Sequence, residues 1–236
     1  MLDAILERQP EKASPDVMFT HGGGKHAIPA LVKSLRALDV PVTAVVDFDI
    51  LNDSNPLRPL YESLGGNWDD IEELWGRVKK AVEGKKPQLS SMEVKSEIEK
   101  ILAKTKGTTF PKDAATQIQK VLKVSSPWAN AKEAGKAFVP SGDTTQNYMS
   151  LNAQMKQQRC FIVEVGELEG FVRSIGGSNK PEWLNKVLKK DLQRDPELEE
   201  ARKFINDIFA TLITPSTEVS ESPSAPSKSL PQVAEP

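Results

Sequence analysis

Residues 42–49, Val42-Thr43-Ala44-Val45-Val46-Asp47-Phe48-Asp49, decide how the rest of this chain is interpreted. They form a β-branched, apolar run that ends in two acidic residues one position apart, and this pattern predicts a buried strand. Because side chains alternate faces along a strand, Asp47 and Asp49 should point the same way at its carboxyl end, with Phe48 turned into the packing.

Two neighbouring carboxylates repel each other unless a cation lies between them. Mg²⁺ prefers such oxygen sites, completed by water and phosphate. Asp47 and Asp49 therefore predict a site for Mg²⁺ or Mn²⁺. The alternative is that both aspartates close the strand and cap the following turn, a position that Asp favours. Asp53 either adds a more distant carboxylate to the metal site or belongs to ordinary turn chemistry.

The segment before this strand predicts a βαβ unit. Residues 17–20 are expected to form a buried strand, followed by the glycine turn His21-Gly22-Gly23-Gly24-Lys25. Apolar residues then recur at helical spacing from Ile28 to Leu38, with Pro29 in the first turn. Such units are right-handed with parallel strands, and their ligands gather beyond the carboxyl ends of the strands. The glycine turn and the aspartate pair should share that edge.

The glycine turn, Gly22 to Gly24 with Lys25, suits a phosphate, because backbone N–H groups, a helix start and a cation are brought together. The spacing is not that of a P-loop, which needs four residues between its glycines and Ser or Thr after the lysine. A tight strand-to-helix turn with an exposed lysine explains the same residues. His21 is a candidate general base or metal ligand, or a structural histidine.

A second strand is expected at residues 159–165, followed by Gly166-Glu167-Leu168-Glu169-Gly170. If this strand is parallel to residues 42–49, its carboxyl end lies at the same edge of the sheet. Glu169 would then complete the metal site, with Glu167 nearby. The alternative is that these glutamates stabilise the dipole of a following helix.

Apolar periodicity predicts helices over most of residues 67–138 and again after residue 180. The expected organisation is an α/β domain with a small, Rossmann-like parallel sheet flanked by helices. Its expected parts are an N-terminal helix and linker (1–15), a first part of the α/β domain (16–66), a helical insertion (67–140), a second part with C-terminal helices (141–214) and a disordered tail (215–236). The tail is expected because Ser, Pro, Glu and Ala replace nearly all apolar anchors there.

Composition restricts the function. The chain has 236 residues, 38% hydrophobic and 27% charged, as in globular proteins. No apolar run approaches the roughly 20 residues that span a bilayer, and the N-terminus has no signal-peptide core. With a single cysteine, Cys160, neither an internal disulfide nor a cysteine-rich zinc site is expected. We therefore expect a cytoplasmic protein without a membrane partner. A net charge of −2 means that any nucleic-acid binding needs a local basic patch.

The order of motifs resembles the TOPRIM domain, the metal-binding fold of topoisomerases, primases and OLD-family nucleases. The strand ending Asp47-Phe48-Asp49 matches its Asp-x-Asp motif, and Gly166-Glu167-Leu168-Glu169 resembles the OLD-type segment after the last strand. The resemblance covers residues 16–54 and 158–190. The first motif departs from the family: a glutamate and a further acidic residue are expected where this chain has His21 and Lys25.

The resemblance implies a Mg²⁺- or Mn²⁺-dependent endonuclease acting on DNA or RNA. Asp47, Asp49 and Glu169 would hold the metal, Lys25 and the glycine turn would hold the phosphate, and His21 would be base or ligand. OLD-family modules usually follow an ABC-type ATPase on the same chain and are often linked to defence against phage, so an ATPase partner or upstream domain is expected, with a homodimer as a further possibility. The alternatives are a catalytically degenerate module that docks on the ATPase and a small-molecule phosphotransfer enzyme.

Overall fold

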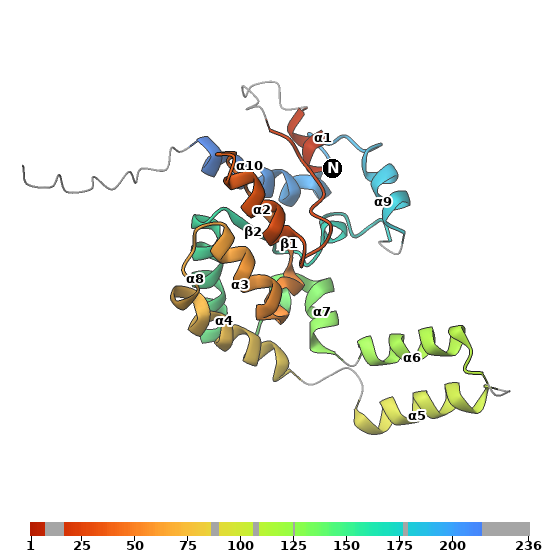
Figure 1. Cartoon of the computed structure of the whole chain (residues 1–236). Helices are drawn as coiled ribbons and strands as arrows, with labels where there is room; N and C mark the ends of the chain where they lie inside the picture. Colours follow the sequence, from red (N-terminus) through yellow and green to blue (C-terminus); the bar gives the residue numbers. More distant parts are fainter. Residues whose placement is uncertain (8–16, 86–89, 106–108, 125, 177–178, 214–236) are drawn as a thin grey trace, which may run out of the picture.

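Figure 1 shows the computed structural model of the chain, which describes residues 1–7, 17–85, 90–105, 109–124, 126–176 and 179–213. Most of these residues are helical, and two short strands form a small parallel sheet. Strand β1, Ala44–Asp47, pairs with β2, Cys160–Val163, so that Asp47 lies opposite Val163 at the carboxyl edge. The expected small parallel sheet is confirmed, and it is formed by two segments whose parallel direction the sequence left as a condition.

The expected strand at residues 17–20 is wrong. This segment carries no strand pairing within the described residues, and Met18 is 89% exposed and Phe19 40% exposed. Only Val17 packs on the core. The glycine turn and helix α2, Ile28–Arg36, therefore precede β1 without a parallel strand of their own. Strand β1 finds its partner more than a hundred residues later, because Val45 and Val46 match the apolar run of β2 in register.

The sheet separates two hydrophobic clusters. Ala44, Val46 and Ile162 face a cluster built with α3 (Ser54–Ser63), α4 (Trp68–Glu83), α7 (Pro127–Ala134) and α8 (Asp143–Gln157). Phe161 and Val163 face a second cluster built with α1 (Leu2–Glu7), α9 (Lys180–Val187) and α10 (Glu199–Ile213). This alternation along β2 makes a layered α/β arrangement, since one strand buries both of its faces.

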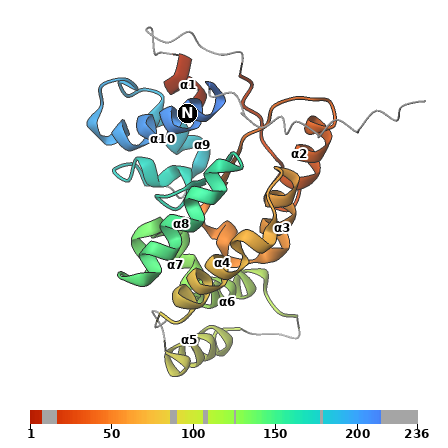
Figure 2. The ribbon, with the colours of Figure 1, turned by 90° about the vertical axis from the view of Figure 1, so that its left-hand side faces the viewer.

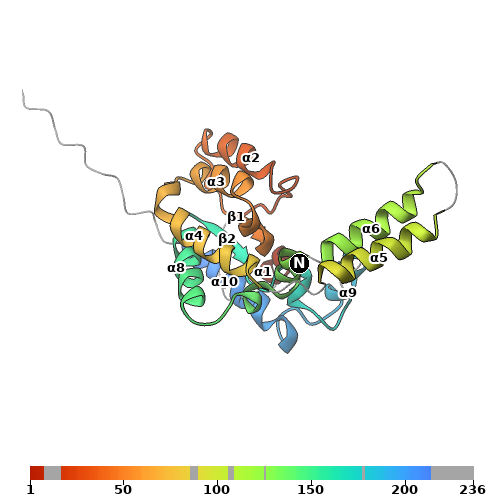
Figure 3. The same ribbon diagram turned by 90° about the horizontal axis from the view of Figure 1, so that it is seen from below.

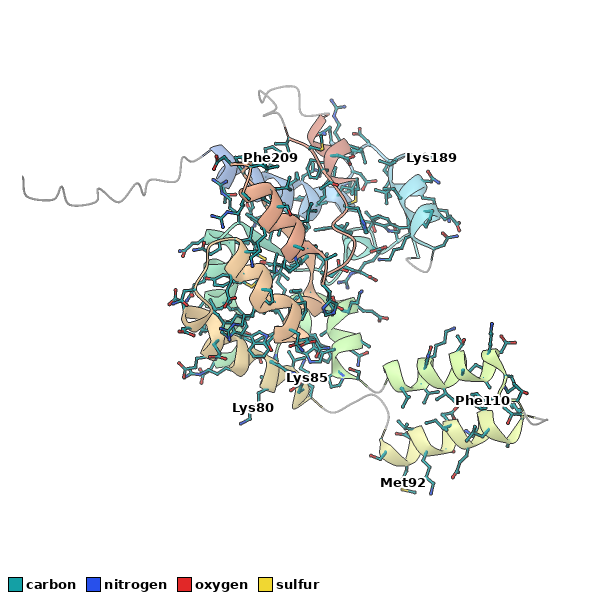
Figure 4. The ribbon with its side chains drawn as sticks, viewed as in Figure 1. Lys80, Lys85, Met92, Phe110, Lys189 and Phe209 are labelled. Carbon is teal, nitrogen blue, oxygen red and sulfur yellow. The ribbon has the colours of Figure 1, made fainter. Side chains whose placement is uncertain are left out.

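Helices α5 (Ser91–Ala103) and α6 (Lys112–Val124) form a pair that projects from the body (Figure 3). Figure 2 shows this pair at the opposite end of the molecule from α1, α9 and α10. Helix α5 begins with a capping box between Ser90 and Glu93 but has no buried residue, and Met92 points away from α6 (Figure 4). Within residues 67–140, α4 and α7 belong to the main core, and α5 and α6 are the part that projects.

Side-chain caps begin two of the helical segments. Asn67 caps α4, accepting a hydrogen bond from the Asp69 amide. Asp195 caps the 3-10 turn η4, Pro196–Leu198, which leads into α10. The predicted disordered tail at 215–236 lies outside the described residues, as does most of the linker before residue 17. Among the described residues, no helix is long and apolar enough to cross a bilayer.

Candidate functional site

Contrary to the prediction from the sequence, the Asp47 and Asp49 side chains do not project from the same strand. Strand β1 ends at Asp47, and Asp49 belongs to the 3-10 helix η1, Phe48–Asn52. The expectation that both aspartates share one strand face is therefore wrong, because the backbone turns at Phe48. The burial of Phe48 is confirmed: its side chain is fully buried, with its ring centroid 5.6 Å from that of Tyr148.

The charges of Asp49 and Glu169 nevertheless both act on the Asp47 carboxylate. The pKa of Asp47 is raised above its ordinary value, first by burial and then by the negative charges of Asp49 and Glu169. Lys132 and Lys180 oppose this rise. Segments more than a hundred residues apart thus contribute acidic groups to one place, as the parallel pairing predicts.

Backbone packing fixes the turn that follows β2. The amide of Phe48 donates a 2.7 Å hydrogen bond to the Gly166 carbonyl oxygen, and the amide of Lys136 donates one of the same length to the Glu164 carbonyl. Gly135 and Gly166 both have positive φ, at 60° and 109°. A Cβ at Gly135 would lie 2.0 Å from the Glu164 carbonyl oxygen, and one at Gly166 would lie 2.0 Å from the Lys132 carbonyl oxygen. Only glycines allow this close approach.

Two glutamates follow this turn. Glu167 immediately precedes the 3-10 helix η3, Leu168–Phe171, and Glu169 lies within it. Glu169 is 8% exposed, which is rare for an acidic side chain without a partner. Its carboxylate lies 2.9 Å from the ammonium nitrogen of Lys180, the first residue of α9. This contact is the first cause that raises the pKa of Lys180, with Glu167 and Asp47 adding to it.

Three lysines form ion pairs with the four carboxylates and leave one net negative charge. The Lys132 ammonium, on α7, lies 3.6 Å from Asp47 and 3.8 Å from Glu167. The Lys180 ammonium lies 3.4 Å from Glu167, and Lys25 lies 3.3 Å from Asp49. We call this group the acid–lysine cluster. Its members are Asp47, Asp49, Glu167, Glu169, Lys25, Lys132 and Lys180.

The glycine turn places Lys25 in the acid–lysine cluster and leaves His21 outside it. Gly23 and Gly24 have φ of 73° and 99°, and α2 begins only at Ile28. His21 is exposed, and its Nδ1 accepts a 3.2 Å hydrogen bond from the Gly23 amide. Within the described residues, His21 forms neither a hydrogen bond nor an ion pair with these carboxylates, while Lys25 pairs with Asp49. One of the amides expected to face a phosphate is therefore engaged inside the turn.

Asp53 acts as the N-cap of α3. Its carboxylate accepts a 2.9 Å hydrogen bond from the Asn55 amide. This is the turn chemistry that the sequence also allows, and it is the contact that the structure gives to Asp53.

Lys132 and Lys180 were not identified from the sequence. Lys132 has one local signal, because it lies three residues before Gly135, the glycine that packs on the turn after β2. Lys180 precedes Pro181 at a helix start, a position that gives no indication of a distant carboxylate partner.

The acid–lysine cluster fits a hard divalent cation in its chemistry. All of its acceptors are carboxylate oxygens, the donors that Mg²⁺ and Mn²⁺ favour. As the side chains lie, however, each carboxylate faces a lysine, and the described residues include no group of three acidic, histidine or cysteine side chains placed to hold a metal. Metal binding here requires that lysine ammonium groups give up their carboxylate partners.

Comparisons with known proteins add no assignment: no protein-family model matches the chain, and no curated protein or solved structure matches it.

Proposed function

We propose that this chain is a TOPRIM-like domain of the OLD-family type that cleaves nucleic-acid phosphodiesters with Mg²⁺ or Mn²⁺. The observation that supports the proposal is that the charges of both Asp49 and Glu169 act on Asp47, at the carboxyl edge of two parallel strands. The likeness rests on the segments around β1 and β2, since the strand expected before the glycine turn is absent from the described residues.

In this proposal Asp47, Asp49 and Glu169 hold the metal. The bound ion supplies an activated water and stabilises the charge that develops on the phosphate. With an ion held by these carboxylates, Lys25, Lys132 and Lys180 would be released from their ion pairs and could contact the nucleic-acid phosphate. This exchange supplies the local basic patch that a chain of net charge −2 needs.

Lys25 is the best supported of the proposed phosphate-binding residues, because it already reaches Asp49 from the glycine turn. His21 can act as the general base only if the glycine turn moves its imidazole ring closer to the carboxylates of the cluster. Its Nδ1 accepts the Gly23 amide, so Nε2 carries the proton in the neutral ring, and Nδ1 must leave this amide before it can accept a proton as a base.

The second candidate is a degenerate TOPRIM-like module that docks on an ABC-type ATPase. The observation that favours it is the pairing of every carboxylate of the cluster with a lysine. In such a module, lysine ammonium groups occupy the place of the metal ion, and the domain keeps its fold but does not catalyse hydrolysis. The two candidates share a fold and differ in whether a divalent ion displaces the lysines.

A plasmid-nicking assay with Mg²⁺ and with Mn²⁺ tests the first candidate. Nicking by the full chain should disappear in the double variant Asp47→Ala/Asp49→Ala and persist in Asp53→Ala, which removes a helix cap and no cluster carboxylate. Equal nicking by the wild type and the double variant would overturn the nuclease. Absence of nicking together with absence of Mn²⁺ binding favours the docking module.

A further inference from the structure

Helix α5 has one side that the described part of the chain leaves uncovered. Its half-buried residues Val94, Ile98 and Ile101 recur at helical spacing, and α6 is the element on which α5 packs. Helix α5 has no buried residue, and the α5–α6 pair projects from the body (Figure 3). The side of α5 that is turned away from α6 is therefore accessible to another molecule.

Four exposed side chains follow one another along this accessible side. Met92, Lys95, Glu99 and Leu102 are separated by three, four and three residues, so they lie along one line of the helix. The apolar ends of this line are open to solvent, since Met92 is 83% exposed and Leu102 is 43% exposed. The same spacing forms the contact line of paired helices. We call these four residues the α5 stripe.

The α5 stripe is complementary to its own reverse. Met92 and Leu102 lie five residues to either side of Glu97, and Lys95 and Glu99 lie two residues to either side of it. A second α5 that runs antiparallel, about a two-fold axis at the level of Glu97, sets Met92 against Leu102 of the second copy and Lys95 against its Glu99. Each contact then occurs twice, as a two-fold interface requires. A parallel pair would instead set Lys95 against Lys95.

The charged residues at the centre of the α5 stripe are available for this pairing. Within one chain the Lys95 ammonium lies 3.9 Å from the Glu99 carboxylate, and both side chains are largely exposed. In the pair of helices each gains a second opposite charge, which selects the antiparallel direction. Two helices of 13 residues touch over only about 20 Å, so the contact is smaller than that of a stable dimer. The expected dissociation constant is on the order of 100 µM.

We propose that this chain forms a weak homodimer through antiparallel pairing of the α5 stripes of two copies. The partner that covers the accessible side of α5 is thus a second copy of the chain. The dimer does not depend on the proposed function, because the α5 stripe and the acid–lysine cluster share no residue.

The test is sedimentation equilibrium of the full chain between about 10 µM and 1 mM. The average mass of the wild type should rise over this range from that of one chain toward that of two. Lys95→Glu and Glu99→Lys each place like charges opposite one another at both central contacts. Each variant should dimerise about tenfold more weakly than the wild type.

Mixing separates a dimer contact from a structural role of these residues. An equimolar mixture of Lys95→Glu and Glu99→Lys should associate again, because the acidic stripe of one variant then meets the basic stripe of the other. The double variant Lys95→Glu/Glu99→Lys exchanges the two charges and should dimerise like the wild type. Lys189→Glu is the control, since it makes the same charge change at an exposed residue after α9, at the opposite end of the molecule (Figures 2 and 4).

Three results would each overturn the proposal. The first is a wild type that stays monomeric up to about 1 mM, the weak end of specific affinities. The second is dimerisation of Lys95→Glu as tight as that of the wild type, which would place the contact elsewhere. The third is a mixture of the two single variants that associates no more than either variant alone. Circular dichroism checks that each variant is folded.

Discussion

The amide of Phe48 donates a 2.7 Å hydrogen bond to the carbonyl oxygen of Gly166, and this bond joins the two segments that carry the acid–lysine cluster. It follows the last pair of β1 and β2, Asp47 and Val163, and joins Phe48 to the turn three residues beyond Val163. Because Asp47 precedes Phe48 and Glu167 follows Gly166, their side chains begin from a fixed backbone. The convergence of the acidic groups is therefore a property of the sheet edge.

The glycine contact behind this edge gives a prediction on stability. Gly135→Ala should lower the free energy of unfolding by about 3 kcal/mol or more, because the new Cβ meets the Glu164 carbonyl and the φ of 60° is strained for alanine. Gly76→Ala is the matched control: Gly76 lies in α4 with open space around it, and alanine there should stabilise by about 0.5–1 kcal/mol. Urea denaturation measures both. Changes of the same sign would contradict the close packing at Gly135.

Cys160 should be a reporter of global unfolding. Its side chain is fully buried in β2, and burial raises the pKa of the thiol to about 12. Reaction with thiol reagents needs both access and the thiolate. We expect labelling at pH 8 to follow the same urea dependence as the loss of helical signal. Rapid labelling of the folded chain would show that β2 is open.

Glu197 predicts a pH dependence of stability. Hydrogen bonds from the Ser174 hydroxyl and amide, and from Lys190, lower the pKa of Glu197 to about 2. Since the folded pKa is below the ordinary value of 4.5, this stabilisation is present above pH 4.5 and is lost as pH falls toward 2.

Glu197→Gln should therefore unfold at lower urea than the wild type at pH 7, and the two curves should approach each other between pH 4.5 and 2. Glu72→Gln, on the exposed face of α4, is the control and should shift neither curve. A difference between Glu197→Gln and the wild type that stays constant with pH would reject the role given to Ser174 and Lys190.

The ion pair of Lys180 gives a prediction on the affinity of the cluster for a divalent metal ion. Its ammonium lies 2.9 Å from Glu169, so under the proposed function a divalent ion must compete with it. Lys180→Met should bind Mn²⁺ about tenfold more tightly than the wild type, since that competitor is gone. Lys186→Met, on the same helix but paired with Glu182, should bind like the wild type. Weaker binding by Lys180→Met would mean that the lysine supports the site.

The sequence predicted the parts of this structure that local pattern controls. The β-branched run before Asp47 and the apolar run of β2 are local signals, and each is confirmed as a strand. The parallel direction of these two strands was a condition in the sequence, and the register of β1 on β2 meets it. The turn at Phe48 was missed, because the backbone breaks the strand one residue before the alternation could carry Asp49 onto the same face.

The errors arise where tertiary contacts override local pattern. Residues 17–20 read as a strand from composition, but no neighbouring strand pairs with them in the described part of the chain. The lysines of the cluster come from α7 and α9, helices that the sequence does not connect with the sheet edge. Pairing of Lys132 with Asp47 depends on Gly135 and Gly166 approaching across the turn, which no periodicity encodes.

Calorimetric titration of the full chain with Mn²⁺, at pH 7 and moderate salt, tests the central claim most directly. The account predicts a saturable site that is lost in Asp47→Asn/Glu169→Gln and kept in Asp53→Asn, whose carboxylate only caps α3. If the wild type binds no Mn²⁺, or if the double variant binds it equally well, then the carboxylates at this sheet edge form ion pairs with lysines and do not bind a metal ion.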